Sequence, residues 1–260
     1  MPIMLVLLAL GGLAVGSFLN VVIVRVPAHE SLLRPRSHCP YCEAPIAARD
    51  NIPILSWFLL RGKCRACGED IPLGYPLVEA ANAVLWVLAG LRFGVDWPTP
   101  AFAALFSVLL ALSVIDLELY LLPDRITYPS IVASLVILAG LSFVATDNPK
   151  GAILGALIGG VGYAGFLAVT LVAYELVAHK EGMGIGDIKL AVVLGLWIGW
   201  LHPILVIHAI ILAGVLSVVV GGIALVVRRT SQPYPFGPWL AIGAIVVILA
   251  SSPLLDAAGL

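Results

Sequence analysis

Long apolar runs separated by short polar segments make up most of this sequence. Eight of them approach or reach the length of about 20 apolar residues that a helix needs to cross a lipid bilayer. They cover residues 3–24, 77–93, 101–116, 126–145, 151–178, 188–201, 203–227 and 238–255. Some are short, and the division of two runs around Pro203 is open. The pattern predicts an all-α polytopic membrane protein with about eight transmembrane helices.

Composition supports a membrane protein and narrows its partners. The 260 residues are 61% hydrophobic and 11% charged, whereas soluble domains carry about 25% charged residues. No basic face stands out beyond one loop, so nucleic acid is not an expected partner and the lipid bilayer is. Residues 1–24 lack a basic start and an A-x-A cleavage site, which favours a first transmembrane helix over a removed signal peptide.

Basic residues are distributed unevenly between the two sides of this predicted arrangement. When the polar segment 25–76 is placed inside, twelve of the fourteen basic residues fall in inside loops and only Arg92 and Lys150 fall outside. The twelve are Arg25, Arg34, Arg36, Arg49, Arg61, Lys63, Arg65, Arg125, Lys180, Lys189, Arg228 and Arg229. By the positive-inside rule, segment 25–76 is cytoplasmic and both termini are periplasmic.

Segment 25–76 holds all four cysteines, in a C-x2-C-x21-C-x2-C array formed by Cys39, Cys42, Cys64 and Cys67. Four thiolates at this spacing are typical of a structural zinc site, which leaves no position open for a substrate. Two disulfides would need an oxidising compartment. Redox chemistry of the thiols and a cluster without metal are also open. The expected domains are therefore a first transmembrane helix (1–24), a cytoplasmic zinc-binding domain (25–76) and a seven-helix core (77–260).

Two aspartates flank the third polar junction of the chain. Asp116 closes the run 101–116, where a carboxylate opposes the helix macrodipole and gains nothing structurally. Asp124 follows Pro123 at the start of the next run, where an N-cap role is equally reasonable. A carboxylate near membrane depth usually has a function, and Asp116 is the stronger candidate of the two.

A third aspartate, Asp187, follows glycines at 182, 184 and 186. We expect Gly184 and Gly186 to permit a tight turn with positive φ at the mouth of the next run. The run lacks the Lys-Ser/Thr of a phosphate-binding loop. Lys189 lies one turn further on, where it either extends to the membrane interface or tunes Asp187.

These motifs together resemble the type IV prepilin peptidases, bacterial membrane aspartic proteases of the GxGD class. The resemblance covers nearly the whole chain, in order. Its carriers are Gly16–Val22 with Arg25-Val26-Pro27, the loop Cys39–Cys67, Tyr75–Glu79, Asp116 with Leu122-Pro123-Asp124, Gly184–Asp187 with Lys189-Leu190, and Pro235–Pro238. Gly74 departs from the pattern, because arginine usually precedes Tyr-Pro there.

The resemblance implies a function and a set of site residues. Asp116 and Asp187 would be the catalytic pair, with Asp124, Gly184, Gly186 and Lys189 as accessory residues near the site. The family removes the basic leader of prepilins and pseudopilins after a glycine, in type IV pilus and type II secretion systems. Many members then methylate the new N-terminus with S-adenosylmethionine. Structural zinc and an inner-membrane location follow in the same way, but no motif locates the residues that bind the methyl donor.

Two other classes of function compete with a protease. A membrane transporter would use its acids for ions or protons, but here the acids lie near helix ends and no inverted repeat is evident. A non-catalytic, zinc-containing scaffold would have no need of the aspartate pair.

Overall fold

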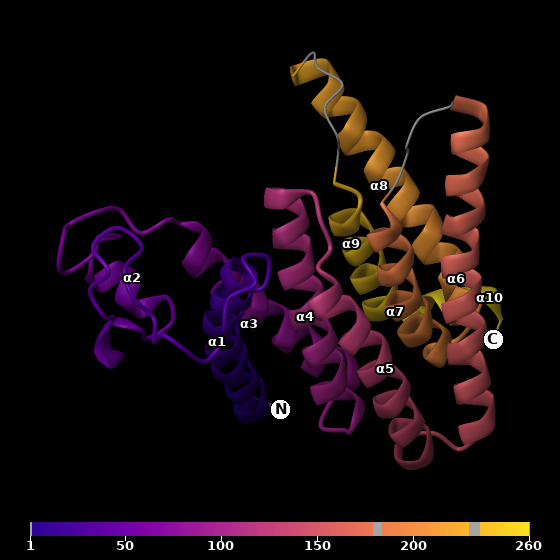
Figure 1. Cartoon of the computed structure of the whole chain (residues 1–260). Helices are drawn as coiled ribbons and strands as arrows, with labels where there is room; N and C mark the ends of the chain where they lie inside the picture. Colours follow the sequence, from indigo (N-terminus) through magenta and orange to yellow (C-terminus); the bar gives the residue numbers. More distant parts are fainter. Residues whose placement is uncertain (1, 179–183, 229–234, 260) are drawn as a thin grey trace. The chain divides into compact units, whose positions relative to one another are not determined.

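The computed structural model describes residues 2–178, 184–228 and 235–259. Over these ranges the chain is helical and contains no β-strand, which confirms the predicted all-α fold class (Figure 1). Lys180, Gly182 and Arg229, which entered the sequence predictions, lie outside the described residues. The elements are α1 (Pro2–Arg25), the 3-10 helix η1 (Ala48–Asp50), α2 (Leu55–Leu59), α3 (Gly74–Phe93), α4 (Pro98–Leu119), α5 (Asp124–Ala145), α6 (Pro149–Ala178), α7 (Ile185–Leu201), α8 (Leu205–Arg228), α9 (Gly237–Leu249) and α10 (Ser251–Ala258).

The helices have the lengths and apolarity of a polytopic membrane protein. Within the described ranges, six of them (α1, α3, α4, α5, α6 and α8) are long and apolar enough to cross a membrane. The pair α9 and α10, bent by 68°, makes a seventh if it counts as one span. The helix α7 has 17 residues and is the short one. The count of eight spans stays a prediction, and the break between α9 and α10 was not predicted.

The chain forms two compact units, Met1–Ala111 and Leu112–Leu260, and α4 contributes to both. In the first unit α1 packs closely on α3. A Cβ added at Gly12 would lie 2.7 Å from the Cα of Ala83, and one at Gly16 would lie 2.7 Å from the Cα of Glu79. Small residues four apart allow this close approach, as is common between membrane helices. The buried Asn82 side chain adds a hydrogen bond, donating to the Gly12 carbonyl at 2.8 Å.

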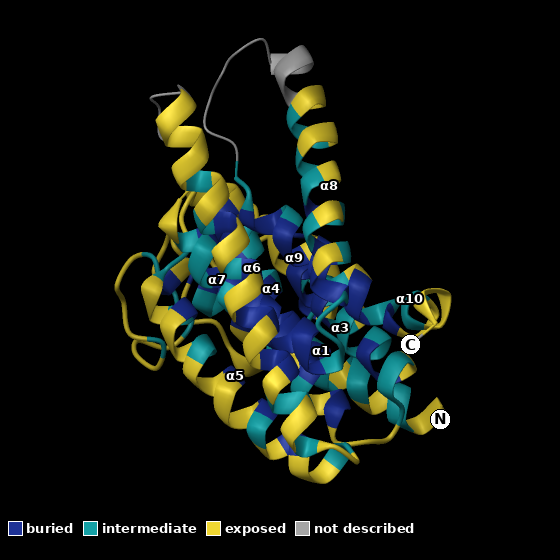
Figure 2. Ribbon diagram, turned by 90° about the vertical axis from the view of Figure 1, so that its right-hand side faces the viewer, coloured by how far each residue is buried: buried dark blue, intermediate teal, exposed yellow. Residues whose placement is uncertain are grey.

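In the second unit α7 is the central helix, and α5, α6, α8 and α9 all contact it. Residues 193–200 are buried without interruption, whereas α5 and much of α6 are exposed on their outer faces (Figure 2). A helix that is apolar on all sides is expected in such an interior position. Because protein rather than lipid surrounds α7, its length need not match the bilayer.

Glycines bring α6 and α7 together. A Cβ at Gly155 would lie 2.6 Å from the Gly199 carbonyl oxygen, and one at Gly199 would lie 2.8 Å from the Cα of Gly159. A Cβ at Gly159 would collide with the Gly195 carbonyl oxygen. The backbones of the two helices are thus in direct contact, so the position of α7 is fixed tightly.

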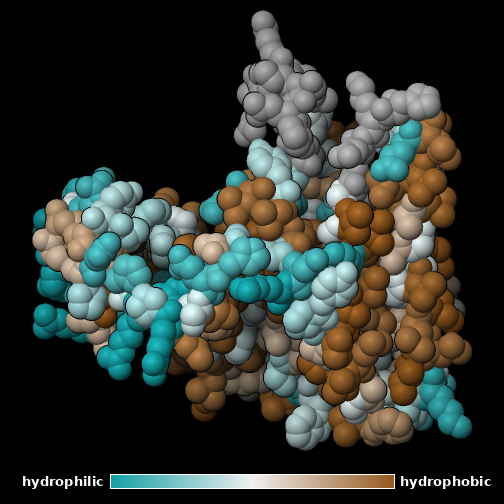
Figure 3. Space-filling model, viewed as in Figure 1, coloured by the Kyte–Doolittle hydropathy of each residue, from teal (hydrophilic) through white to brown (hydrophobic). Residues whose placement is uncertain are grey.

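On its other side, α7 is hydrogen-bonded to α5 through two indole groups. Trp197 Nε1 donates to Ser134 Oγ at 2.8 Å and Trp200 Nε1 donates to Ser142 Oγ at 2.9 Å. The outer surfaces of α5 and α6 carry apolar side chains, as Figure 3 shows. Exposed apolar surface of this extent fits contact with lipid chains.

Candidate active site

Asp116 lies in the last turn of α4 and is 5% exposed. The helix ends because Tyr120 adopts φ 56, a left-handed conformation typical of helix C-termini. The N–H of Tyr120 donates to the Asp116 carbonyl oxygen at 3.0 Å. The chain then turns back through Leu122 and Pro123, and α5 begins at Asp124. This turn holds the Asp116 carboxylate at the end of its helix.

Asp187 lies in the first turn of α7 and is 7% exposed. Gly184 is the residue that caps this helix, and the Asp187 carboxylate accepts a hydrogen bond from its backbone N–H. The expectation of positive φ in this segment was wrong for both described glycines: Gly184 has φ −74 and Gly186 is an ordinary helical residue. Size is what matters at Gly186, because a Cβ there would lie 3.0 Å from the Cβ of Leu122.

Asp116 is also held by the start of α9. The backbone N–H of Gly237 donates to Asp116 Oδ2 at 3.0 Å, and this contact is buried. A Cβ at residue 237 would lie 2.8 Å from the same oxygen and 3.4 Å from Leu122 Cδ2. The N-terminus of a helix attracts negative charge. The carboxylate that opposes the macrodipole of α4 is therefore stabilised by the N-terminus of α9.

The two aspartates are brought together in the second unit. Asp116 is close enough to Asp187 for the charge of one carboxylate to be felt by the other, and Leu122 packs against both Gly186 and Gly237, the residues that adjoin them. Each carboxylate thus lies at the N-terminus of a different helix. Two buried carboxylates that interact at close range share a proton and can activate a water molecule.

Lys189 is directed to α5. Its Nζ lies 2.6 Å from Asp124 Oδ1 and 4.7 Å from the centre of the Tyr128 ring. Asp124 is the first residue of α5, preceded by Pro123 at the N-cap, and its carboxylate pairs with lysine. Of the accessory residues, Asp124 and Lys189 are thus brought together, and Gly184 and Gly186 lie beside Asp187.

In the first unit, the four cysteines converge as the spacing predicts. The Sγ atoms of Cys39, Cys42, Cys64 and Cys67 lie within 4.8 Å of one another, and those of Cys39 and Cys67 are 3.9 Å apart. A tetrahedral zinc site with Zn–S bonds of about 2.3 Å brings its sulfurs to about this separation, whereas a disulfide needs about 2.05 Å. The cluster fits a metal held by four thiolates.

Two similar turns form this cluster. The N–H of Glu43 donates to the Cys39 carbonyl at 2.9 Å, and the N–H of Gly68 donates to the Cys64 carbonyl at 2.9 Å. Glu43 and Gly68 both have positive φ, at 58 and 77. Each pair of cysteines therefore lies in its own turn, and the two turns have the same type of backbone conformation. Next to the second turn, Arg65 forms a bidentate ion pair with Asp50, at 2.7 and 2.9 Å.

Ionisation of the four cysteine thiols would be favoured by a bound cation. Backbone N–H groups of Cys67 and Ala66 lower the pKa of Cys64 to about 6. The Cys67 thiol also has a backbone hydrogen bond, to Glu69, yet burial and the neighbouring thiols raise its pKa to about 12. The Cys64 thiolate therefore forms readily whereas Cys67 resists ionisation, and a bound metal ion would favour the ionised form of the cluster.

The cysteine segment is attached to α3 by Glu79, a carboxylate to which the sequence motifs assign no role in this segment. Glu79 Oε2 accepts a hydrogen bond of 2.7 Å from the N–H of Ile54, whose φ is 61. Positive φ is rare for a β-branched residue. On α1, Asn20 Nδ2 donates to the Tyr75 carbonyl at 3.2 Å, and Arg25 donates to the Ser31 carbonyl at 2.9 Å. These polar side chains position the cysteine segment on α1 and α3.

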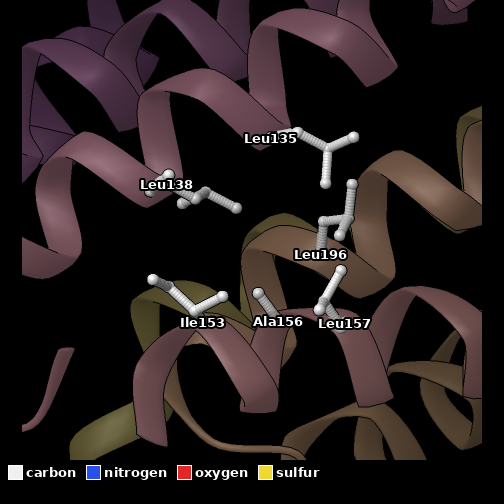
Figure 4. A pocket seen from close by; sticks show the side chains of 7 residues that line it. Leu135, Leu138, Ile153, Ala156, Leu157 and Leu196 are labelled. Carbon is white, nitrogen blue, oxygen red and sulfur yellow. The ribbon is translucent and has the colours of Figure 1, made fainter. Parts of the chain in front are cut away.

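A small cavity between α5, α6 and α7 does not belong to the site. It has a volume of about 30 Å³ and is lined by Leu135, Leu138, Ala139, Ile153, Ala156, Leu157 and Leu196 (Figure 4). The cavity has room for water, but its apolar lining side chains offer no polar partner for it. The cavity has neither the size nor the chemistry to hold a methyl donor such as S-adenosylmethionine.

Comparison with protein families gives two matches along the chain. The Bacterial Peptidase A24 N-terminal domain matches residues 10–93, which include the four cysteines. The Type IV leader peptidase family matches residues 103–222, which include Asp116 and Asp187. The two matches meet near the division between the compact units.

Individual relatives are similar over almost their whole length. A prepilin leader peptidase/N-methyltransferase of Aeromonas hydrophila is 38% identical, with 94% of this chain and 89% of the relative covered. One of Neisseria gonorrhoeae is 36% identical, with 96% and 92% covered. The type 4 prepilin-like proteins leader peptide-processing enzyme of Escherichia coli O78:H11 is 36% identical, with 94% and 93% covered. No solved structure matches the chain.

Proposed function

The chain belongs to the type IV leader peptidase family, and from this premise we propose that it is a membrane aspartic endopeptidase that cleaves the basic leader of prepilins and pseudopilins after a glycine. The observation that carries the proposal is the meeting of two buried carboxylates from different helices, Asp116 of α4 and Asp187 of α7. The prediction that these residues are catalytic is part of the proposal.

In the proposed mechanism, one of the two aspartates is ionised and the other is protonated, so the pair carries a single negative charge. The ionised carboxylate removes a proton from a water molecule, which adds to the carbonyl carbon of the scissile peptide. The protonated carboxyl donates its proton to the carbonyl oxygen, which gives a tetrahedral intermediate. The amine then takes up the proton that the first carboxylate removed from water and leaves as the carbon–nitrogen bond breaks. A hydroxyl proton of the intermediate returns to the second carboxylate as the new carboxyl group forms. The N–H groups of Gly237 and Gly184, each at a helix N-terminus, stabilise the negative charge of the pair.

The proposed membrane arrangement agrees with this chemistry. We propose eight spans in the bacterial inner membrane, with both termini periplasmic and the cysteine segment and the aspartate pair on the cytoplasmic side. The basic residues of the inside loops support this orientation. A basic leader stays in the cytosol by the same rule, so its cleavage site would reach the membrane boundary where the aspartates lie.

We propose that the cysteine segment, residues 25–76, holds a structural zinc ion. Its thiols fit tetrahedral coordination, and the ion would neutralise the four thiolates and fix the two turns. Purified protein should contain one zinc per chain, and Cys39→Ser or Cys64→Ser should abolish zinc retention. Asp187→Asn is the matched control and should keep its zinc. A wild-type protein purified without any metal, at neutral pH and without chelator, would contradict the assignment.

The proposed second reaction is methylation of the new N-terminus with S-adenosylmethionine. Its support is the name of the relatives, prepilin leader peptidase/N-methyltransferase. No residue is assigned to the methyl donor, and the small aliphatic cavity does not fit it.

The mass of a processed substrate tests both reactions. Purified protein in detergent should shorten a prepilin by its leader, and with S-adenosylmethionine the product should gain one methyl group. Asp116→Asn and Asp187→Asn keep the size of each side chain and remove the acid. Each should lower the cleavage rate by about 10³-fold or more. Cleavage that persists in either variant would refute the catalytic pair, and a prepilin of unchanged mass with wild-type protein would refute the activity.

A further inference from the structure

Lys189 is two residues beyond Asp187 on α7 but faces another way. Residues of a helix are about 100° apart, so side chains two positions apart point to nearly opposite sides. Asp187 is buried, whereas the Lys189 side chain is 21% exposed and contacts α5. Lys189 is therefore directed at α5 and not at the Asp187 carboxylate, so it would act on that carboxylate through the position of the helix.

The α5 surface that receives Lys189 has two parts. Asp124 and Tyr128 are four residues apart, so they share one face of α5. The carboxylate lies 2.6 Å from Nζ, and the Tyr128 ring lies beneath the same ammonium, 4.7 Å from its centroid to Nζ. The ion pair and the cation–π contact hold the same group, which fixes the lysine in one geometry.

Asp124 is connected in turn to Asp116. Only the turn after α4, which contains Tyr120 at φ 56 and Pro123, separates them along the chain. The ion pair therefore completes a closed ring that runs from Asp116 through the turn to Asp124, across to Lys189 and back along α7 to Asp187. Both aspartates lie on this ring.

From this ring we propose that Lys189, with Asp124 and Tyr128, is a positioning brace that sets the register of the first turn of α7 against the turn after α4, and thereby the separation of the two carboxylates. The inference rests on the proposed function of Asp116 and Asp187. Catalysis is sensitive to such geometry, since a misplacement of about 1 Å can reduce a rate about 10²-fold. Exposed ion pairs, in contrast, add little to global stability. Turnover should therefore depend on the brace far more than folding does.

The test measures kcat and KM for prepilin leader removal by the full-length protein in detergent. Lys189→Met and Asp124→Asn should each lower kcat by about tenfold or more, with KM within about twofold. The double variant should be no slower than either single variant, because the brace is lost once. Lys189→Arg should retain most of kcat, since a guanidinium reaches the carboxylate and stacks on the ring.

Arg125→Met is the matched control. It removes a positive charge beside Asp124 from an exposed position and should leave kcat unchanged. Melting temperatures within a few degrees of wild type would show that the variants fold. Wild-type kcat in Lys189→Met, additive losses in the double variant, or a change in KM alone would each overturn the brace. Asp187→Asn separates the two failures: if it is inactive while Lys189→Met is fully active, only this inference falls, and if it still cleaves, the proposed function falls too.

Discussion

At the scale of single residues, the site depends on backbone groups as much as on acids. Gly237 donates its N–H to Asp116 from a position 121 residues away along the chain. Its Cα leaves no room for a side chain, because Asp116 and Leu122 occupy that space. The requirement at residue 237 is thus small size next to a helix N-terminus.

Gly237→Ala should therefore impair cleavage without unfolding the protein. The added methyl group would lie 2.8 Å from Asp116 Oδ2, so the carboxylate must move away from the N–H that holds it. We expect kcat to fall by about 10²-fold. Gly214→Ala is the control, since nothing lies within 4 Å of its Cβ. Equal rates for the two variants would contradict the role of Gly237.

The ion pair of Asp50 with Arg65 gives a prediction of pH dependence. The hydrogen bond from Arg65 lowers the pKa of Asp50 below its usual value of 3.8. A lowered pKa means that the pair stabilises the fold above that value and that this contribution is lost as the pH falls through the folded-state pKa. The difference in stability between wild type and Arg65→Gln should therefore be largest at neutral pH and vanish in strong acid.

Hydrogen exchange measures this difference locally. The ratio of exchange rates in residues 48–58, Arg65→Gln over wild type, cancels the intrinsic pH dependence of exchange. It should exceed one from neutral pH down to about 4 and approach one at lower pH. A ratio that is constant across this range would show that Arg65 acts by packing and not by charge.

The sequence predicts a site well where its residues lie within a few positions of one another, and poorly where the contact joins distant parts of the chain. The cysteine cluster follows from two C-x2-C pairs, and each pair is preset by its own turn. The hydrogen bond from Gly237 to Asp116 is a tertiary contact, with no sign in the sequence except a Gly-Pro at the start of an apolar run. The positive φ expected at Gly184 was wrong because the glycines there provide space and not a special turn.

At the scale of helices, the glycine contact between α6 and α7 fixes the helix that carries Asp187. Apolar runs alone located the six helices of the described ranges that are long and apolar enough to cross a membrane, because each such helix satisfies its own backbone in an apolar medium. They did not show that α7 would be enclosed, nor that the last run bends by 68° between α9 and α10. Those features depend on which helices become neighbours.

Gly159→Ala should weaken this helix pair. Its methyl group would meet the carbonyl oxygen of Gly195, a rigid backbone atom. We expect a loss of about 1–3 kcal/mol in stability, seen as a lower melting temperature in detergent. Gly162→Ala on the same helix has open space at its Cβ, and it should melt at or above the wild-type temperature. A wild-type melting temperature for Gly159→Ala would show that α6 and α7 are not tightly packed.

At the scale of the whole molecule, the number of spans determines on which side of the membrane the C-terminus lies. Six or eight spans place both termini on the same side of the membrane, and seven place them on opposite sides. The helix α7, about 26 Å long from its 17 residues, decides between these counts together with the bent pair α9–α10. Its enclosure by protein lets it be shorter than the bilayer requires of a lipid-facing helix.

Reporter fusions measure this arrangement. Alkaline phosphatase, which is active only in the periplasm, should be active when fused after Leu260 and inactive when inserted between Glu30 and Ser31. The second fusion is the internal control for the cytoplasmic side. An inactive fusion at Leu260 would mean an odd number of spans and would overturn the eight-span topology.

The amide that holds Asp116 belongs to the main chain, so no exchange of side chain at residue 237 deletes it and only proline would. An inhibitor that binds both Asp116 and Asp187 would thus depend on groups that the protein could not change by mutation without lowering its own cleavage rate. Escape from such an inhibitor would have to arise at the rim of the site, and the mutants selected would map where the substrate enters.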